Sequence, residues 1–255
     1  MKYALISDVH SNLPALEAVL ADIDARGDVD VVHHLGDLVG YAPWPDEVVA
    51  LVRERGIGGI AGNYDSTVAH DYKHCGCKAD SPRAEELSHE SYGWTRAHVS
   101  PQTKRYLGGL PFRMDLRPRG GHVSRPQITL VHGSPTLNTL YWTEDRPDPF
   151  CEKMAKAAGL KGGDLIAFGH THKPWTREVG GIRFLNTGSV GKPKDGDWRA
   201  GYVLVEAGEE VRPPEFVRVE YDLERAVEGV RASDLPDEFA DQLRAGGTPR
   251  PVEVP

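Results

Sequence analysis

The stretch Tyr3-Ala4-Leu5-Ile6-Ser7-Asp8-Val9-His10 is a short apolar run that ends in two metal-binding residue types, Asp8 and His10. The same pattern returns four times along the chain. The later apolar runs are followed by Gly36-Asp37, Gly62-Asn63, Val131-His132-Gly133 and Gly169-His170-Thr171-His172. Such runs are typical of buried strands in a packed sheet, and ligands of these folds lie beyond the strand ends. We therefore expect an α/β fold that gathers these side chains at one edge of a sheet.

The residue types in this set point to a metal site. Two Asp, one Asn and four His would hold two divalent metal ions. Carboxylate oxygen and neutral imidazole nitrogen suit Mn, Fe, Zn, Co or Ni, whereas thiolate-rich sites favour structural zinc. A carboxylate can bridge two cations, and Asp37, alone at its strand end, is the natural bridge. His170 and His172 lie two residues apart, so in an extended segment both point to one side and reach neighbouring metals.

The first third of the chain alternates predicted strands and helices. Helices are expected over residues 15–25 and 45–55, and the resulting β-α-β-α-β order implies a parallel sheet with right-handed crossovers. Residues 64–125 break this rhythm and are interpreted as a mostly helical insert. Within the insert, the pattern predicts helices over residues 84–99 and 100–107.

Strand-like segments return after the insert. They cover residues 165–168, 182–185, 202–205 and 215–221. Their short links, which contain glycine, suggest an antiparallel second sheet. We interpret residues 1–245 as one domain and residues 246–255 as a C-terminal tail that is too rich in proline to pack regularly.

Composition limits the classes of partner. The chain has 255 residues, of which 39% are hydrophobic and 27% charged, which is ordinary for a globular domain. Its net charge of −8 argues against a general nucleic-acid or anionic-membrane binder, since both need a basic surface; a local basic patch stays open. No apolar stretch approaches the roughly 20 residues that span a bilayer. We expect neither nucleic acid nor membrane as a general partner.

The cysteines and the N-terminus bear on location. Three cysteines, an odd number, do not make a disulfide framework and fit a reducing compartment. The apolar run at the start of the chain ends at Ser7-Asp8 and is too short for the apolar core of a signal peptide. It predicts a first strand instead. The sequence therefore predicts a cytoplasmic protein.

The five motifs in their order resemble the calcineurin-like metallophosphoesterases, and the resemblance covers residues 1 to about 205. It implies a four-layer α/β/β/α sandwich of two mixed β-sheets flanked by helices. It also implies two divalent ions, Mn before Fe, Zn, Ni, Co or Mg. One ion would be held by Asp8, His10 and His172, and the other by Asn63, His132 and His170, with Asp37 as the bridge. A metal-bridging hydroxide would attack phosphorus, which places Asp37, Asn63 and His132 among the catalytic residues.

One position departs from the pattern of the family's protein phosphatases. They have a His after the Asn of the third motif, whereas this chain has Tyr64, followed by Asp65. Tyrosine, with an ordinary pKa of about 10, is a poor general acid at neutral pH, although it can donate a hydrogen bond. Bacterial small phosphodiesterases of the superfamily also lack that His, so the resemblance is closest to that branch. We expect Asp65 to orient or cap its neighbours.

Weaker signals leave alternatives open. The loop from Asn186 to Pro193 resembles a loop of the same bacterial branch, and its amides with Lys192, Lys194 or Arg199 could meet a substrate phosphate; a plain glycine-rich turn is the equal alternative. His34 could lie behind the metal ligands and support one of them, or it could be an ordinary packed histidine.

Two groups in the insert carry their own alternatives. His70, His74, Cys75 and Cys77 have the residue types of a zinc site or a redox pair, but an ordered loop with reduced thiols is the preferred reading. Trp94, with Tyr92 and His98, would face a substrate base or, more simply, pack in the core.

We predict a dinuclear metal-dependent phosphoesterase that hydrolyses small-molecule phosphodiesters or nucleotide-type phosphates. The alternatives are a non-catalytic or weakly catalytic scaffold of the same fold and a protein phosphatase, which Tyr64 disfavours. The partner is then a small phosphate ester, and the oligomeric state is left open. Neither the physiological substrate nor the native metal follows from the sequence.

Overall fold

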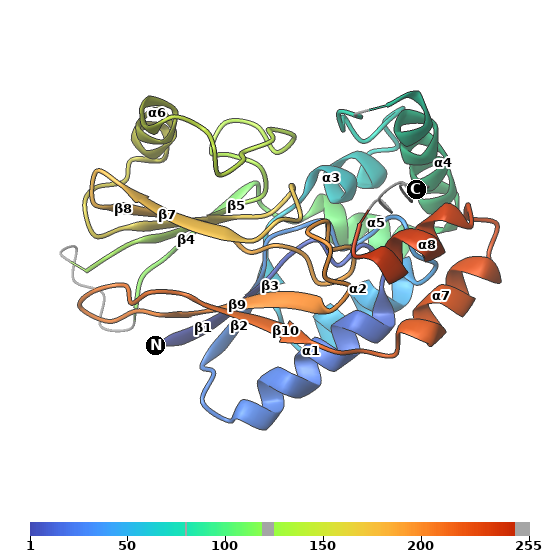
Figure 1. Ribbon diagram of the computed structural model, residues 1–255, viewed down its shortest axis with the longest axis horizontal. Helices are drawn as coiled ribbons and strands as arrows, with labels where there is room; N and C mark the ends of the chain where they lie inside the picture. Colours follow the sequence, from blue (N-terminus) through green and yellow to red (C-terminus); the bar gives the residue numbers. More distant parts are fainter. Residues whose placement is uncertain (80, 119–124, 248–255) are drawn as a thin grey trace, which may run out of the picture.

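Two five-stranded sheets face one another and carry helices on their outer sides (Figure 1). The computed structural model describes residues 1–79, 81–118 and 125–247. The expected tail at residues 246–255 therefore lies almost entirely outside the described residues.

The first sheet joins the predicted N-terminal parallel strands to two later ones. In spatial order its strands are β10 (Glu215–Val219), β9 (Ala200–Glu206), β1 (Lys2–Ile6), β2 (Val31–His34) and β3 (Gly58–Gly59). β1, β2 and β3 are parallel, with Tyr3 opposite Val31. β9 runs antiparallel to both β1 and β10.

The second sheet is mixed as well. In spatial order its strands are β4 (Arg113–Leu116), β5 (Ile128–Val131), β6 (Leu165–Phe168), β8 (Ile182–Asn186) and β7 (Trp175–Val179). β5, β6 and β8 are parallel, and β4 and β7 flank them as antiparallel edges. The prediction of one antiparallel sheet made of all the late strands is wrong. The first six of the seven residues of β9 are buried, so this strand belongs inside the first sheet beside β1 and not in a half-exposed sheet.

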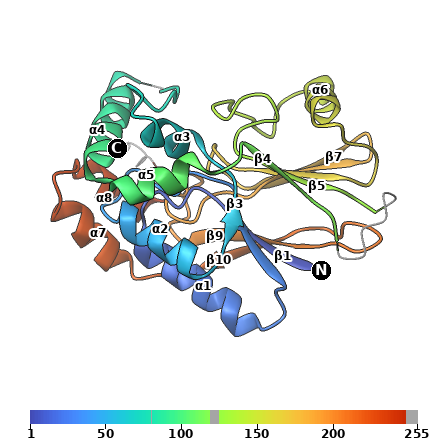
Figure 2. The same cartoon turned by 180° about the vertical axis from the view of Figure 1, so that it is seen from behind.

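The helices form the outer layers. In the described part of the chain they are α1 (Leu13–Arg26), α2 (Pro45–Glu54), α3 (Asn63–Ala69), α4 (Pro82–His98), α5 (Pro101–Gly108), α6 (Asp148–Ala158), α7 (Leu223–Arg231) and α8 (Glu238–Ala245). Helices α1 and α2 cover the first sheet and α6 covers the second, while α3, α4, α5, α7 and α8 gather at one end of the molecule (Figure 2). The predicted four-layer α/β/β/α sandwich is confirmed.

Strand alternation divides the core into layers. On β1, Ala4 and Ile6 pack with the helices over the first sheet, whereas Tyr3 and Leu5 pack between the two sheets. Successive side chains of a strand point to opposite faces, so one strand serves both layers and must be apolar on each. This explains why the opening run has no polar residue before Ser7. A third cluster, with Phe168 at its centre, lies under α6.

Helix α1 begins as its sequence predicts. The Asn12 side chain accepts a hydrogen bond of 3.2 Å from the Ala15 N–H, and Pro14 lies in the first turn. Gly27 ends the helix in a left-handed conformation, with φ of 67°. The Asn12 cap thus fixes where the short loop between β1 and α1 passes into the helix, and this loop carries Asp8 and His10.

The segment after the third motif holds α3, α4 and α5 and then β4. The helices predicted over 84–99 and 100–107 correspond to α4 and α5. The sequence reading missed β4, because its residues are only partly buried and its polar residues made it resemble a loop. The division into one domain with an insert at about 64–125 stays a prediction. Among the described helices, none combines the length and the apolar character that a membrane crossing needs.

Candidate metal centre

Five of the seven predicted ligands adopt the left-handed backbone conformation. They are Asp8 (φ 53°), His10 (49°), Asp37 (53°), His170 (64°) and His172 (60°). Residues with a Cβ rarely take this conformation, and such residues cluster at functional sites, where the surrounding structure holds them. The strand-end loops are therefore shaped to aim these side chains, at a cost in backbone energy.

Backbone hydrogen bonds lock the loops to one another. The His10 N–H donates to the Asp37 carbonyl at 3.0 Å, and the Gly169 N–H donates to the His132 carbonyl at 2.9 Å. The loops also approach closely at glycine: a Cβ on Gly62 would lie 2.1 Å from Asp37 Oδ1. Only glycine permits that approach. The motif glycines thus let the loop backbones reach the carboxylates.

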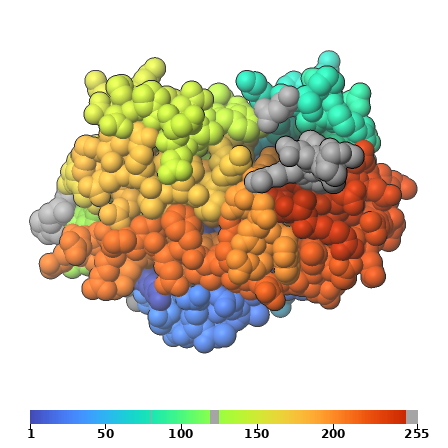
Figure 3. Space-filling model, in the orientation of Figure 1, coloured from blue at the N-terminus to red at the C-terminus, as the bar shows by residue number. Residues whose placement is uncertain are grey.

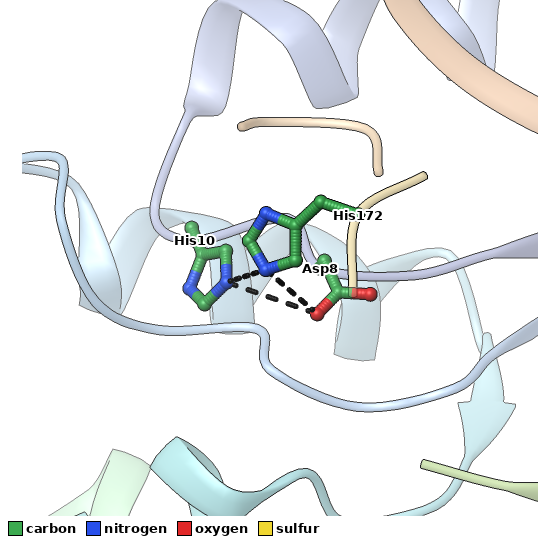
Figure 4. A group of neighbouring side chains, drawn as sticks. All are labelled: Asp8, His10 and His172. Atoms are coloured by element: carbon green, nitrogen blue, oxygen red, sulfur yellow. Dashed lines mark hydrogen bonds and ion pairs between the residues drawn. The ribbon is translucent and has the colours of Figure 1, made fainter. Parts of the chain in front are cut away.

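Asp8, His10 and His172 form the first group (Figure 4). Their candidate ligand atoms lie within 4.8 Å of one another, and all three residues are buried. Asp8 Oδ1 lies 3.3 Å from His172 Nε2 and 3.8 Å from His10 Nε2, and the two Nε2 atoms are 3.1 Å apart. Asp8 Oδ2 accepts hydrogen bonds from the Ser7 hydroxyl and the His170 N–H. One carboxylate oxygen is thus held by the protein, while the other faces the imidazoles.

Asp37, His132 and His170 form the second group, with the same 4.8 Å limit between their candidate ligand atoms. Asn63 adds its side-chain oxygen, which lies 3.1 Å from His132 Nε2. The Asn63 amide nitrogen points the other way and donates to the Cys75 carbonyl at 3.2 Å. The amide oxygen is therefore the atom that Asn63 presents to the group.

Asp37 lies between the two groups. Its Oδ1 accepts a hydrogen bond of 2.8 Å from the Tyr64 N–H. Its Oδ2 lies 3.4 Å from His132 Nε2 in one group and 3.8 Å from His10 Nε2 in the other. A single oxygen atom of Asp37 thus faces both groups.

Three of the imidazoles have their tautomer set by backbone carbonyls. The Nδ1 atoms of His10, His132 and His172 lie 3.1, 2.8 and 2.6 Å from the carbonyl oxygens of Val39, Leu35 and Lys192. A carbonyl only accepts, so each Nδ1 carries a hydrogen, and whenever the ring is neutral its lone pair lies on Nε2. All three Nε2 atoms face the carboxylates. Such outer hydrogen bonds are the usual way in which proteins orient metal-binding histidines.

Charge and burial act differently on the four histidines. Burial lowers the pKa of His10 and of His170 to about 3 and lowers that of His172 well below its usual range. Burial opposes the charging of His132 too, but the adjacent Asp37 carboxylate outweighs it and raises the pKa to about 10. At neutral pH the two groups thus hold three uncharged imidazoles, while the Asp37 carboxylate stabilises the protonated form of His132.

In the two donor groups, two buried atoms have no hydrogen-bond partner among the described residues. They are Asp8 Oδ1 and His170 Nε2, one in each group. A buried polar atom without a partner costs free energy, so its presence calls for an explanation such as an ion. The paired Nε2 atoms of His10 and His172 pose the same problem, because two lone pairs face each other. Divalent cations would satisfy all of these atoms, so the donor set fits the predicted metals.

Tyr64 lies beside the first group but directs its hydroxyl elsewhere. Its ring is 5.6 Å from the His10 ring, and its hydroxyl donates to Ser91 Oγ on α4 at 3.4 Å. Burial raises the pKa of Tyr64 well above its ordinary value. Asp65 accepts hydrogen bonds of 2.9 Å from the Leu38 and Gly62 N–H groups, which is the orienting role expected for it.

A cleft of about 150 Å³ opens onto the two groups and is lined by His10, Asp37, His170 and His172 among others. The sequence analysis missed several of the residues in its walls. These are Tyr41, Lys78, Leu87, Tyr141, Phe239 and Gln242. Tyr41 follows the second motif closely and could have been suspected from that, whereas residues of α8 carry no signal that places them here. The segments around residue 141 and around α4 stand on either side of a dip along the upper edge of Figure 3.

The structure separates the three cations of the loop after β8. Lys192 and Lys194 line the cleft, whereas Arg199 lies outside it and pairs with Asp197 at 2.7 Å. Burial and the neighbouring Lys194 lower the pKa of Lys192. Two lysines that line one cleft favour the interpretation in which this loop meets a substrate phosphate over that of a plain glycine-rich turn.

The prediction that Cys75 and Cys77 are reduced thiols in an ordered loop is wrong. Cys75 and Cys77 form a disulfide, where reduced thiols were expected. The two residues flank Gly76, whose positive φ of 74° folds the loop back and brings the two side chains together. With the histidines of the loop, they do not make a metal-competent group among the described residues.

The other side chains singled out earlier pack away from the cleft. Trp94 stacks on His98 with ring centroids 3.9 Å apart, and Tyr92 donates to the Tyr72 carbonyl, so core packing is the correct reading of α4. His34 is buried, and neither of its ring nitrogens has a hydrogen-bond partner in the part of the chain that the structure describes. We have no role for it in the site.

The sandwich and its strand-end cluster define the class. A sequence model of the calcineurin-like phosphoesterase superfamily domain matches residues 1–210, and the chain belongs to that superfamily. The uncharacterised protein MJ0912 of Methanocaldococcus jannaschii is 31% identical, covering 95% of this chain and 97% of its own length.

Solved structures show the same relationship. A metallophosphoesterase from Sphaerobacter thermophilus is 31% identical, with a TM-score of 0.73 over 96% of this chain and 100% of its own. The hypothetical protein PH1004 from Pyrococcus horikoshii OT3 is 22% identical, with a TM-score of 0.79 over 97% of this chain and 99% of its own, and shares the fold. The superfamily and the two groups of donors together indicate a metal-dependent phosphoesterase.

Proposed function

We propose that this protein is a dinuclear phosphoesterase that hydrolyses small-molecule phosphodiesters or nucleotide-type phosphates. The observation that carries the proposal is the position of Asp37. One of its oxygen atoms faces an imidazole of each donor group, at 3.4 and 3.8 Å, whereas Asp8 Oδ1 lies 3.9 Å from His132, the imidazole it approaches in the other group. Two separate single-metal sites would not need a shared oxygen.

The seven side chains divide into ligand sets. Asp8, His10 and His172 would hold one ion, and Asn63, His132 and His170 the other, with Asp37 between them. Bound there, divalent ions would lower the pKa of a water molecule and neutralise the oxygens of a phosphate. Mn is the metal we expect first, because the donors are oxygen and imidazole nitrogen and do not include a thiolate.

The chain's own residues would orient this set. The carbonyls of Val39, Leu35 and Lys192 keep three imidazoles turned with Nε2 inward. Asp65 holds the Gly62 and Leu38 amides, which positions the loops that carry Asn63 and Asp37. Tyr64 closes one wall beside His10 without offering an acid, because its hydroxyl is engaged with Ser91. We therefore expect substrates with good leaving groups.

The test combines metal analysis with hydrolysis. Protein loaded with Mn should contain two ions per chain and should release p-nitrophenol from bis-p-nitrophenyl phosphate, and a chelator should stop the reaction. His132→Ala removes a ligand and should abolish turnover. His98→Ala is the matched control, since that histidine stacks on Trp94 and does not line the cleft.

Two other results would favour the alternative functions. Metal-loaded protein that is inactive on a broad panel of mono- and diesters would favour the scaffold reading. Activity confined to phosphorylated proteins would favour a protein phosphatase. A cytoplasmic location stays a prediction, and the disulfide removes the reduced-thiol argument for it.

A further inference from the structure

Lys192 lies deep in the wall of the cleft. Only 8% of its surface is exposed, which is unusual for a lysine. Its ammonium group donates to Gln242 Oε1 at 2.6 Å and lies 4.4 Å from the centroid of the Tyr41 ring and 5.7 Å from that of Phe239. The cation is thus held by an amide and two aromatic faces.

No carboxylate pairs with Lys192 in the part of the chain that the structure describes. The buried carboxylates of the donor groups, Asp8 and Asp37, face histidines. A buried cation without a counter-ion is costly, and neutral partners offset only part of that cost. An anion bound in the cleft that Lys192 lines would offset that cost.

This place adjoins the metal centre. The Tyr41 ring that lies under the Lys192 ammonium group is also 4.9 Å from the His10 ring. The Lys192 carbonyl accepts the hydrogen bond from His172 Nδ1. Lys194 and Lys78 line the same cleft, so three lysines surround the space next to the donor groups.

We propose that Lys192, assisted by Lys194, binds a second phosphate group of the substrate, next to the phosphate that reacts. The inference rests on the proposed function and sharpens its substrate class. The substrate is then a phosphoester that carries another phosphate a short distance away, as a nucleoside bisphosphate ester does. Tyr41 and Phe239 supply an apolar wall for the part that joins the two phosphates.

A matched pair of esters tests this. Thymidine 5′-(p-nitrophenyl phosphate) and its 3′-phosphorylated form share one leaving group and differ by one phosphate. Wild-type Mn-loaded enzyme should prefer the 3′-phosphorylated ester in kcat/KM by about tenfold or more, the size of a charge-assisted contact. The preference should fall towards unity in Lys192→Gln and in the more exposed Lys194→Gln. Arg199→Gln, on the same segment but paired with Asp197, should keep it.

A binding measurement separates this inference from the proposed function. Calorimetry compares thymidine 3′,5′-bisphosphate with thymidine 5′-phosphate on the Mn-loaded protein. Tighter binding of the bisphosphate that both lysine variants abolish would support the second site, even if neither ester were hydrolysed and the proposed function were wrong.

Two outcomes would overturn the inference while the proposed function stood. The first is hydrolysis of both esters with equal kcat/KM by the wild type, together with equal binding of the two nucleotides. The second is an equal loss on both esters in the lysine variants, which would mean that the lysines hold the reacting phosphate itself.

Discussion

Replacing Asp37 by Asn should separate the two donor groups. The substitution keeps a side chain of the same size, and its oxygen can still accept the hydrogen bond from the Tyr64 N–H, which is 2.8 Å long in the wild type. It places a neutral NH₂ where Oδ2 now faces His132 and His10, at 3.4 and 3.8 Å. The change therefore removes the shared charge with little change in shape.

The expected loss is large. Two unit charges about 4 Å apart interact by about 4 kcal/mol at an effective dielectric constant of about 20, so Asp37 would contribute about 8 kcal/mol towards each divalent ion before desolvation is counted. Water that replaces the carboxylate offsets most of this. Even about 2.8 kcal/mol of remaining loss weakens binding about 100-fold. We expect the variant to retain one Mn of two and to lose turnover.

Metal content and electron paramagnetic resonance measure this directly. Wild-type protein should give the spectrum of two coupled Mn ions, and Asp37→Asn that of a single ion. Asp164→Asn is the matched control: this buried carboxylate also accepts from two backbone N–H groups, those of Gln127 and Lys161, but does not line the cleft. Two coupled ions and near-normal turnover in Asp37→Asn would refute the bridge.

Three further predictions use simpler measurements. Tyr64→His should shift activity towards poorer leaving groups such as alkyl monoesters, because it supplies an acid beside His10. An unchanged dependence of rate on leaving-group pKa would show that no acid acts from this position. Metal uptake should release a proton at neutral pH, because Asp37 raises the pKa of His132 to about 10 against the effect of burial. The metal affinity should then rise with pH up to that value and level off above it. Calorimetry in two buffers of different ionisation enthalpy counts the released proton. Thiol titration of the unfolded, unreduced chain should find one free thiol, and three after reduction, because Cys75 and Cys77 are paired; three thiols without reduction would contradict the disulfide.

The strands and helices that the sequence predicts follow from the spacing of apolar residues and from the polar motifs that end the strands. The run from Tyr3 to Ile6 is apolar on both faces because β1 packs against helices on one side and the second sheet on the other. Such a run identifies a central strand but does not choose its neighbour. This is why β9 was assigned to the wrong sheet, since pairing of β9 with β1 depends on residues about 200 positions apart.

The metal-site donors could likewise be predicted from local motifs, whereas the cleft residues contributed by distant segments could not. The seven donors follow strands, so the order of motifs along the chain predicts that they meet at one edge. The wall of the cleft does not follow strands: Gln242 and Phe239 reach it from α8, and Lys78 from the loop closed by the disulfide. Nothing in the local pattern of those segments distinguishes them from surface positions. Composition was misleading for the cysteines, because an odd number excludes a complete framework but not a single pair.

The backbone strain of the ligand loops explains why the motifs are so short and so strictly ordered. A residue with a Cβ in the left-handed conformation costs on the order of 1–3 kcal/mol, and five of the seven donors adopt it. That cost is offset only if neighbouring loops hold each turn in place, as the bonds from His10 N–H to the Asp37 carbonyl and from Gly169 N–H to the His132 carbonyl do. Each loop therefore depends on the next, and hydrogen bonds of the protein itself hold the set together. The donors are then already turned inward, so an entering cation gains their contacts without having to order them, and the strain stored in folding serves to preorganise the site.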